Sequence, residues 1–227
     1  SSRRKAETVR TQLLEAGLTG LDLLDLDLAD LNSVRRAAAE VSDRYGHLDL
    51  LFNNAGVMAP PRQLTVQGHE LQLGVNHLGH MALTLQLLPL MQARKDARVV
   101  TVTSGAQYFG RIRWDDPSWA QGYDRYGAYS QSKLANVMFA LELEARQQEQ
   151  GGGGSGGGGR TGRKARPRRR SNKARPGAAG GGQYYELTRD GAFRTHSSSD
   201  ESYDEALAKA LWEHSAELTG VSESIWN

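Results

Sequence analysis

Short apolar runs alternate with amphipathic segments along residues 1–148, and this alternation constrains the fold more than any other feature. The runs at 48–52 (LDLLF) and 97–103 (ARVVTVT) have the composition and length of strands. Each is followed by a longer segment that includes a stretch with the pattern of a helix. Strands that alternate with helices build βα units, and these units assemble into a parallel sheet. The sequence therefore predicts an α/β domain with an open parallel sheet.

The same periodicity predicts where the individual elements lie. Amphipathic or strongly apolar stretches of helical length occupy residues 3–16, 30–45, 66–93 and 127–148. Strands are expected at 21–26, 48–52 and 97–103, and a loop at 105–126. The run at 48–52 is interrupted only by Asp49, which predicts a strand buried on both faces of the sheet.

The periodic pattern stops at Gly151, where the sequence becomes GGGGSGGGG. A basic stretch at 160–175 follows, with nine Lys or Arg and no Asp or Glu. Such a composition cannot bury enough apolar surface to offset its ordering entropy, so residues 149–182 are predicted to be disordered. Order returns in 183–227, which we assign to the same fold as 1–148. A short strand is expected near 184–187, and a capping box at 202–205 predicts a helix that ends at Gly220.

The average composition of the chain hides this division. The formal charge is +2, yet without the nine basic residues of 160–175 it is −7. Thirteen of the 26 glycines lie between Gly151 and Gly182. Two interpretations of 160–175 remain open: nuclear localisation or non-specific nucleic-acid binding through clustered charge, and non-native sequence inserted into an enzyme fold.

The composition also excludes several classes of protein. The chain has no cysteine, which excludes disulfides, cysteine zinc sites and thiol nucleophiles. It contains no uninterrupted apolar run of about 18 residues, and no signal peptide is evident at its start, Ser1. We therefore expect no transmembrane segment in this chain and a cytoplasmic or organelle-soluble location.

Two side chains on the predicted helix 127–148 form a pair that can move a proton. Tyr129 and Lys133 are four residues apart and hence lie on one helix face. A nearby ammonium stabilises a phenolate, so the pair can exchange a proton with a carbinol oxygen. The spacing alone is common and more often means a surface tyrosine beside a lysine stem. Its setting is more specific, because Ser104 ends one predicted strand and Asn53–Gly56 ends another.

Several motifs in register resemble the short-chain dehydrogenase/reductase family, in particular its retinol-dehydrogenase-like branch. They are Asn53-Asn-Ala-Gly56, Gly74-Val-Asn-His-Leu-Gly-His80, Arg98-Val-Val-Thr-Val-Thr-Ser104 and Tyr129-Ser-Gln-Ser-Lys133. The tail around Leu211–Gly220 is also similar to the end of that branch. The resemblance covers residues 1–148 and 183–221. It implies a Rossmann-like, doubly wound parallel sheet.

The resemblance also implies roles for individual residues. Tyr129 is the expected general acid/base, Lys133 its charged partner and cofactor contact, Ser104 the group that polarises the substrate carbonyl, and Asn76 part of the proton relay. Cofactor contacts are implied for Arg3, Asp27, Leu28, Asn53, Ala55, Gly56, Tyr129 and Lys133. Arg3 falls where relatives that favour NADP carry a basic residue, so NADP is the expected cofactor and NAD the alternative.

The chain departs from the family pattern at two places. The family begins with a strand and a Gly-rich turn that binds the cofactor pyrophosphate, and this sequence contains no such turn. The family continues after the Tyr/Lys helix with a strand and a substrate lid, where this chain has residues 149–182. We therefore expect a fold that is incomplete at the N-terminus and interrupted by an insert.

Other polar and aromatic groups receive more ordinary interpretations. His69, His77 and His80 lack a carboxylate at ligand spacing, so we predict packing or surface roles and no metal site. Trp114 and Trp119 either line a hydrophobic substrate mouth or cover an edge of the sheet.

Two functions follow from these observations. The first is a nicotinamide-dependent oxidoreductase, or an inactive fragment of one, that interconverts an alcohol and a carbonyl on a hydrophobic small molecule. The alternative is a non-catalytic remnant whose residues 160–175 bind nucleic acid non-specifically. The identity of the substrate is beyond the sequence, and a homo-oligomer is left open.

Overall fold

The computed structural model describes residues 3–92, 94–152, 185–187, 193–195 and 199–222. Its helices are α1 (Arg3–Glu15), α2 (Leu31–Arg44), α3 (Leu71–Leu73), α4 (Gly79–Gln92), α5 (Arg125–Gly152) and α6 (Glu205–Thr219). A π-helical turn, Gly74–Leu78, joins α3 to α4. Two 3₁₀ turns, Gly105–Phe109 and Asp200–Tyr203, precede α5 and α6. The strands are β1 (Leu50–Asn53), β2 (Arg98–Thr101), β3 (Tyr185–Leu187) and β4 (Phe193–Thr195).

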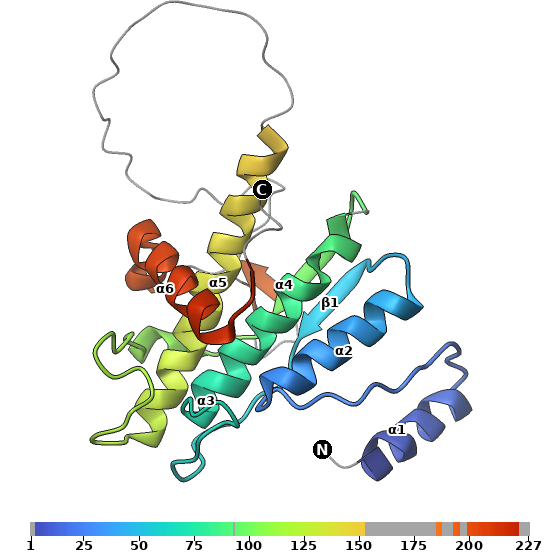
Figure 1. Ribbon diagram of the computed structural model, residues 1–227, viewed down its shortest axis with the longest axis horizontal. Helices are drawn as coiled ribbons and strands as arrows, with labels where there is room; N and C mark the ends of the chain where they lie inside the picture. The colour runs from blue at the N-terminus through green and yellow to red at the C-terminus, as the bar shows by residue number, and fades with distance from the viewer. Residues whose placement is uncertain (1–2, 93, 153–184, 188–192, 196–198, 223–227) are drawn as a thin grey trace, which may run out of the picture.

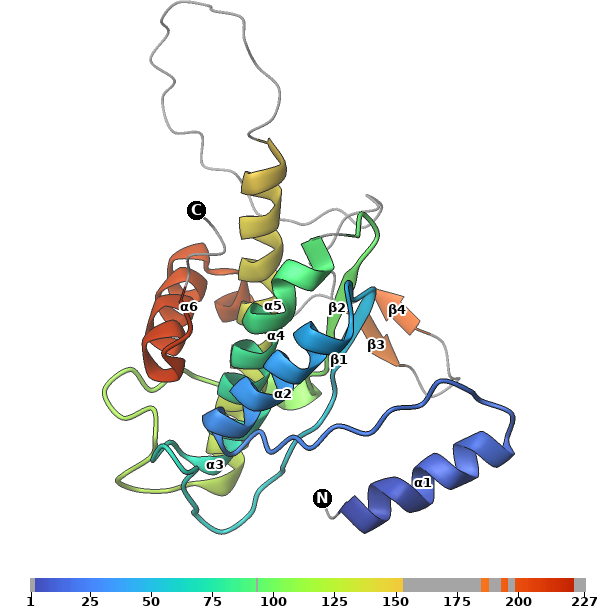
Figure 2. The same ribbon diagram turned by 45° about the vertical axis from the view of Figure 1, so that its right-hand side comes forward.

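Strands β1 and β2 form the parallel sheet that the alternating pattern predicts. Leu50 pairs with Arg98 and Asn53 with Thr101, so both strands end at the same edge. Figure 2 shows α2, α4 and α5 on one side of this pair. The parallel connection through α4 is the βα arrangement expected from the sequence.

The prediction that the run at 48–52 is buried on both faces is wrong. Leu50 is 46% exposed and Phe52 is 61% exposed. Val100 on β2 is also exposed, on the same side as Phe52 by register. The apolar composition matched a strand covered on both faces, but the described helices cover only one of them.

The segment 21–26 was predicted as a strand and this is also wrong. It is extended, but it forms no ladder with any described residue. A strand exists only through hydrogen bonds to a neighbour, and composition alone cannot reveal whether the neighbour is there. Figure 1 shows this segment as part of a long connection that sets α1 apart from the other helices.

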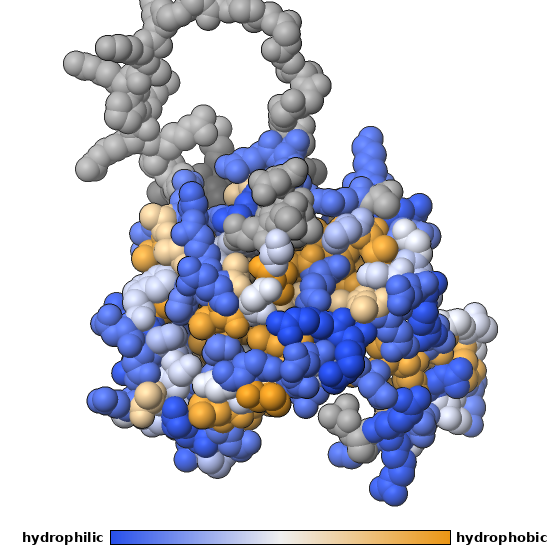
Figure 3. All heavy atoms as spheres, in the orientation of Figure 1, coloured by the Kyte–Doolittle hydropathy of each residue, from blue (hydrophilic) through white to orange (hydrophobic). Residues whose placement is uncertain are grey.

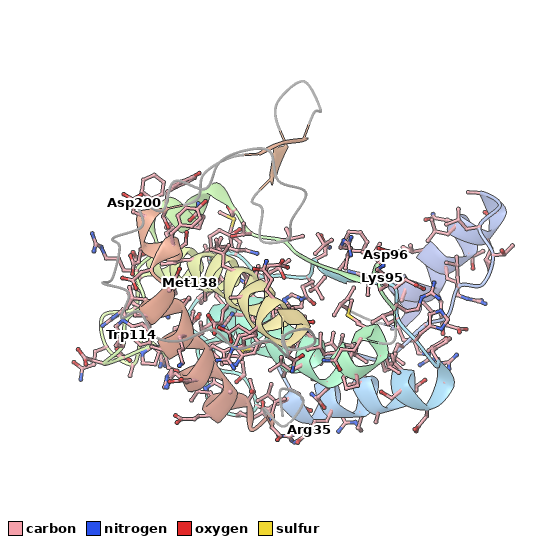
Figure 4. All side chains as sticks on the ribbon, turned by 90° about the horizontal axis from the view of Figure 1, so that it is seen from above. Arg35, Lys95, Asp96, Trp114, Met138 and Asp200 are labelled. Carbon is pink, nitrogen blue, oxygen red and sulfur yellow. The ribbon has the colours of Figure 1, made fainter. Side chains whose placement is uncertain are left out.

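The core lies between the helices and has three apolar clusters. Leu28, Val34 and Leu83 belong to the first, between α2 and α4. The second and third join α5 and α6 to the long α3–α4 helix. Figure 4 shows α5, with Met138 labelled, running between α6 and α4. Figure 3 shows hydrophobic residues in several patches that alternate with hydrophilic residues across the viewed face.

Helix α6 begins at a different residue from the one the capping box indicated. Asp204 is the N-cap, and its carboxylate accepts hydrogen bonds from the backbone N–H groups of Ala206 and Leu207. Ser202 instead lies in the preceding 3₁₀ turn and donates to the carbonyl of Ser199. Gly220 ends the helix as expected, at a φ of +62° that favours glycine.

Replacing Asp204 with alanine is expected to destabilise the protein by about 1 kcal/mol, because two amide groups lose their acceptor. Chemical denaturation would measure the change. Asp200→Ala is the matched control, since it removes the same charge from an exposed residue that caps no amide in the described structure. Equal losses in the two variants would contradict the capping role.

Only a small part of the region predicted to be disordered, 149–182, falls within the described residues. Helix α5 continues to Gly152, four residues beyond the expected boundary at 148. The rest of 149–182, including the basic residues 160–175, lies outside the described residues. The predicted strand at 184–187 appears as β3, which pairs antiparallel with β4.

Candidate active site

Tyr129 and Lys133 occupy the first turns of α5 and face the end of β2. The Lys133 Nζ lies 5.8 Å from the centre of the Tyr129 ring. Lys133 is buried, and its Nζ donates a hydrogen bond of 3.2 Å to the carbonyl of Val102. Burial lowers the pKa of Lys133, because the charged form loses solvation. Tyr129 is half-buried. The pair is therefore assembled as the spacing predicted.

Ser104 follows β2 and starts the 3₁₀ turn that leads away from the sheet. Its Oγ accepts a hydrogen bond of 3.3 Å from the backbone N–H of Ala106, and the side chain remains half-buried. The hydroxyl hydrogen can still be donated to another oxygen. The adjacent Thr103 donates to the carbonyl of Lys133 at 2.7 Å, which fastens this segment to α5.

Asn76 is fully buried within the π-helical turn. Its Oδ1 accepts from the backbone N–H of Val57 at 2.8 Å, and its Nδ2 donates to the carbonyl of Val57 at 3.0 Å. Nδ2 also donates to the Oγ of Ser132 at 2.9 Å. Isolated π turns often occur at functional sites. The sequence indicated an unusual Asn within a helix, but not this geometry.

Gly56 lies against both Asn76 and Lys133. A Cβ atom on Gly56 would lie 3.0 Å from the Oδ1 of Asn76 and 3.7 Å from the Nζ of Lys133. Glycine therefore keeps an open approach to these groups. Gly56 and Ala55 are exposed beyond the carboxyl end of β1, where open parallel sheets bind ligands.

The other residues implied as cofactor contacts are placed differently. The Asn53 side chain is buried and donates to the Oγ1 of Thr84 on α4, so it anchors the strand end rather than lining an open groove. Leu28 packs within the first apolar cluster, and Asp27 is exposed beside it. Arg3 forms ion pairs with Glu7 and Asp25. The structure does not place Arg3 in contact with the Tyr129 group.

The three histidines do not form a metal cluster, and no such cluster occurs among the residues that the structure describes. His77 is buried against Ser215, and His80 is buried with its Nδ1 3.0 Å from the carbonyl of Asn76. His69 is half-buried. The Trp119 ring packs on the guanidinium of Arg113 at 4.2 Å, whereas Trp114 is 41% exposed.

The sequence-based reasoning missed Ser132, which connects two expected site residues. Besides accepting from Asn76, its hydroxyl donates to the carbonyl of Tyr129 at 2.7 Å. Its position between Tyr129 and Lys133 was visible in the sequence. Ser132 is three residues after Tyr129 and so neighbours it on the helix, but helical spacing gave no sign of its bond to Asn76, which comes from another segment.

Gly110 sets the separation between the Ser104 segment and α5. A Cβ atom there would lie 2.5 Å from the carbonyl oxygen of Ser130 and 2.8 Å from the Cβ of Leu134. Both are atoms that cannot rotate away. Gly110→Ala is therefore expected to destabilise the protein by about 2 kcal/mol, as overpacked cores do. Thermal unfolding would measure this loss.

Gly105→Ala is the control for Gly110→Ala. Gly105 begins the 3₁₀ turn that ends just before Gly110, and a Cβ atom on it would meet nothing within 4 Å. Its stability should stay within about 0.5 kcal/mol of the wild type, as for other substitutions that create no clash. A Gly110 variant as stable as the Gly105 variant would contradict the close approach.

Comparison with known proteins identifies the family. A family model described as short chain dehydrogenase matches residues 1–151, well over half of the chain. The chain belongs to the short-chain dehydrogenase family. Members of this family use a nicotinamide cofactor, NAD or NADP. The Rossmann-like fold and the family predicted from the motifs are therefore confirmed.

The relatives include retinol and polyprenol dehydrogenases. The chain is 42% identical over 148 residues to mouse retinol dehydrogenase 14, a match that covers 62% of this chain and 44% of that protein. It is 45% identical over 124 residues to human retinol dehydrogenase 13, covering 54% and 38%. It is 45% identical over 145 residues to mouse polyprenol dehydrogenase, covering 62% and 43%. The chain thus spans less than half of the length of each of these relatives.

Solved structures agree with this assignment. An uncharacterized protein from Mycobacterium paratuberculosis is 36% identical, with a TM-score of 0.68, and the match covers 87% of this chain and 75% of that chain. A structure from Pseudomonas syringae, described as a short chain dehydrogenase, is 25% identical, with a TM-score of 0.50 and coverage of 65% and 58%. In the described part of this chain, no helix has both the length and the apolar character needed to cross a bilayer.

Proposed function

We propose that this chain carries the proton-transfer centre of an NADP-dependent oxidoreductase that interconverts an alcohol and a carbonyl on a hydrophobic small molecule. One observation carries the proposal. Tyr129 and Lys133 lie together on α5, Lys133 is bonded to Val102 and Thr103 just before Ser104, and its Nζ borders the open approach at Gly56.

The residues around Gly56 fit a nicotinamide cofactor. A side chain on Gly56 would fill the space in front of Asn76 and Lys133, which glycine leaves free. In the part of the chain that the structure describes, the buried Lys133 has one acceptor, Val102, for its three N–H groups. No carboxylate among the described residues pairs with it, so it remains able to donate to ribose hydroxyls. Lys133, Tyr129, Ala55 and Gly56 would hold the cofactor, which supplies or accepts a hydride when bound.

Tyr129 moves the proton that accompanies hydride transfer. In reduction its hydroxyl donates the proton to the substrate oxygen, and in oxidation the phenolate takes the proton from the alcohol. The ammonium of Lys133 stabilises the negative charge on the phenolic oxygen. Because Lys133 is buried, its field is screened less than that of a surface lysine.

Ser104 and Asn76 prepare the site for this transfer. The Oγ of Ser104 accepts from Ala106, and its O–H donates a hydrogen bond to the substrate oxygen, which polarises the carbonyl. Asn76 uses its side chain to fix Val57 and Ser132, and through Ser132 it is linked to the backbone of Tyr129. Asn76 therefore supports both the cofactor side and the tyrosine side of the relay.

Exposed apolar side chains around this edge favour a hydrophobic substrate. Met58 is 64% exposed two residues after Gly56. Phe109, at the end of the turn that Ser104 begins, is 84% exposed. The relatives named for retinol and polyprenol act on alcohols of this chemical class.

The preference for NADP rests on Arg3, at the start of α1. A guanidinium binds a phosphate by paired hydrogen bonds. The present partners of Arg3, Glu7 and Asp25, are exposed, so a phosphate can replace them at little cost in free energy. Comparing the dissociation constants of NADP⁺ and NAD⁺ for the wild type and Arg3→Ala tests this preference. A variant that leaves their ratio unchanged would favour NAD or another phosphate contact.

The purified chain with NADPH and a long-chain apolar aldehyde tests the proposed function. We expect the aldehyde to be reduced as NADPH absorbance is lost, and we expect Lys133→Met to weaken cofactor binding. Lys95→Met is the control, because Lys95 is exposed and precedes the amino end of β2, whereas the site lies beyond its carboxyl end. Absence of both NADPH binding and aldehyde reduction by the wild type would overturn the proposal.

A further inference from the structure

A buried polar cluster, formed by Glu70, Gln72 and Tyr123, lies beside the candidate active site. The side chains of Glu70 and Gln72 come from the start of the α3–α4 helix, and both residues are fully buried. Tyr123 comes from the loop that leads into α5. Such a cluster is costly unless its polar atoms are paired, and here they are.

Gln72 uses both N–H donors and the carbonyl oxygen of its amide to bind two different segments. Its Oε1 accepts from the backbone N–H of Ala59 at 2.8 Å. Its Nε2 donates to the carbonyl of Arg125 at 2.9 Å and to the hydroxyl of Tyr123 at 3.1 Å. A single side chain therefore ties the segment after Gly56 to the beginning of α5.

The bond to Ala59 holds a strained backbone in place. Ala59 has a φ of +50°, which is unusual for a residue other than glycine and is retained only where the surroundings enforce it. Val57, two residues earlier, is held by both atoms of the Asn76 amide. Gln72 and Asn76, from adjacent turns of one helix, thus fix the segment that follows Gly56 at two points.

The bond to Arg125 acts directly on the backbone of Tyr129. Arg125 is the first residue of α5, so its carbonyl is the intrahelical acceptor for the N–H of Tyr129. Gln72 donates to this same carbonyl. It therefore restrains the first turn of α5 at the point to which the Tyr129 backbone is bonded, where helices otherwise fray.

Glu70 completes the arrangement around Tyr123. Its Oε2 accepts from the backbone N–H of Leu73 in α3, and its Oε1 lies 3.3 Å from the Tyr123 hydroxyl. Burial, reinforced by the charge of Glu70, raises the pKa of Tyr123. Tyr123 therefore remains a neutral phenol that accepts from Gln72 and donates to Glu70 or to the carbonyl of Pro60.

We propose that Gln72 is a positioning residue of this site: it sets the separation between Tyr129 and the Gly56 segment by binding both backbones. The catalytic part of this proposal, an effect of Gln72 on the rate, rests on the proposed function. Its structural part, the restraint of two separate backbone segments by one amide, stands on the hydrogen bonds alone. Misplacement of a reacting group by about 1 Å can reduce a rate by about 10²-fold.

Amide hydrogen exchange on Gln72→Leu and Gln72→Glu tests the structural part. Leucine removes all three bonds, so the N–H groups of Ala59 and Tyr129 should exchange at least about ten-fold faster, while amides of α2 stay unchanged. Glutamate keeps an acceptor for Ala59 but has no donor for Arg125. It should therefore restore protection at Ala59 and not at Tyr129.

Gln86→Leu is the matched control. Gln86 lies on the same long helix, and its amide donates to the carbonyl of Ala82, away from both segments. It should leave Ala59 and Tyr129 protected. If Gln72→Leu changes neither amide, or speeds exchange equally in α2, the positioning role is overturned. Should the leucine variant not fold, the contrast between the two amides in the glutamate variant decides the question alone.

Steady-state kinetics tests the catalytic part. We expect Gln72→Leu to lower kcat for aldehyde reduction by about ten-fold or more, with a smaller change in KM, since Gln72 touches no substrate. A change confined to KM would overturn the catalytic meaning. If the wild type shows no turnover, it is the proposed function that fails, and the exchange experiment still reports on Gln72.

Discussion

Replacing Tyr129 with phenylalanine is expected to lower the rate of aldehyde reduction by about 10²- to 10⁴-fold, the usual contribution of a positioned proton donor. The change removes only the hydroxyl that transfers the proton. In the described part of the chain that hydroxyl bonds to no other residue, and Lys133 keeps its bond to Val102. NADPH oxidation under saturating aldehyde would measure the effect.

Tyr126→Phe provides the matched control for this substitution. Tyr126 lies three residues earlier on the same helix, is 61% exposed, and loses the same hydroxyl. It should retain the wild-type rate, and both variants should keep the thermal stability of the wild type within about 0.5 kcal/mol. Equal rates for the wild type and Tyr129→Phe would remove Tyr129 from its assigned role.

The sequence predicted best the elements whose local signals agree with one another. Residues 30–45 carry an apolar stripe followed by Gly46, and α2 is found at Leu31–Arg44, with Asp30 as its N-cap. The π turn at Asn76 was not predicted, because its cause is tertiary: the Asn76 amide closes on Val57, which is 19 residues away. Periodicity reports on neighbours along a helix, but not on a partner from another segment.

The same limit applies to the candidate site. Helical spacing places Tyr129 and Lys133 on one face, and strand ends place Ser104 and Gly56 at one edge. Neither pattern indicates whether a side chain at a strand end faces the core or the solvent. The Asn53 side chain, which was expected to contact the cofactor, is buried and donates to Thr84. Gln72 could not be identified from the sequence either, since its partners come from the segment after Gly56 and from the beginning of α5.

Acid is expected to destabilise the fold well above the pH at which carboxylates titrate, and His77 is the principal cause. His77 is buried beneath α6, with its Nε2 2.9 Å from the Oγ of Ser215 and its ring edge-on to Phe139. Burial, together with the nearby His80, lowers the pKa of His77 to about 3. Folding therefore requires the neutral imidazole.

The sign and size of the effect follow from proton linkage. Between the unfolded pKa of about 6.5 and the folded pKa of about 3, the unfolded chain binds a proton that the folded chain cannot, so stability falls as the pH falls. Relative to neutral pH, the loss is about 2 kcal/mol at pH 5 and about 3 kcal/mol at pH 4. Burial also lowers the pKa of His80 and of His69, which adds to the loss in the same direction.

Denaturant unfolding of His77→Gln at several pH values tests this account. Glutamine does not titrate, and its terminal amide can reach the hydroxyl of Ser215, so the variant should lose much of the pH dependence between pH 6.5 and 4. His47→Gln is the control, because His47 is about half exposed beside Asp49. It should keep the wild-type slope. A His77 variant with the same slope would mean that the acid sensitivity arises at His80, His69 or the carboxylates instead.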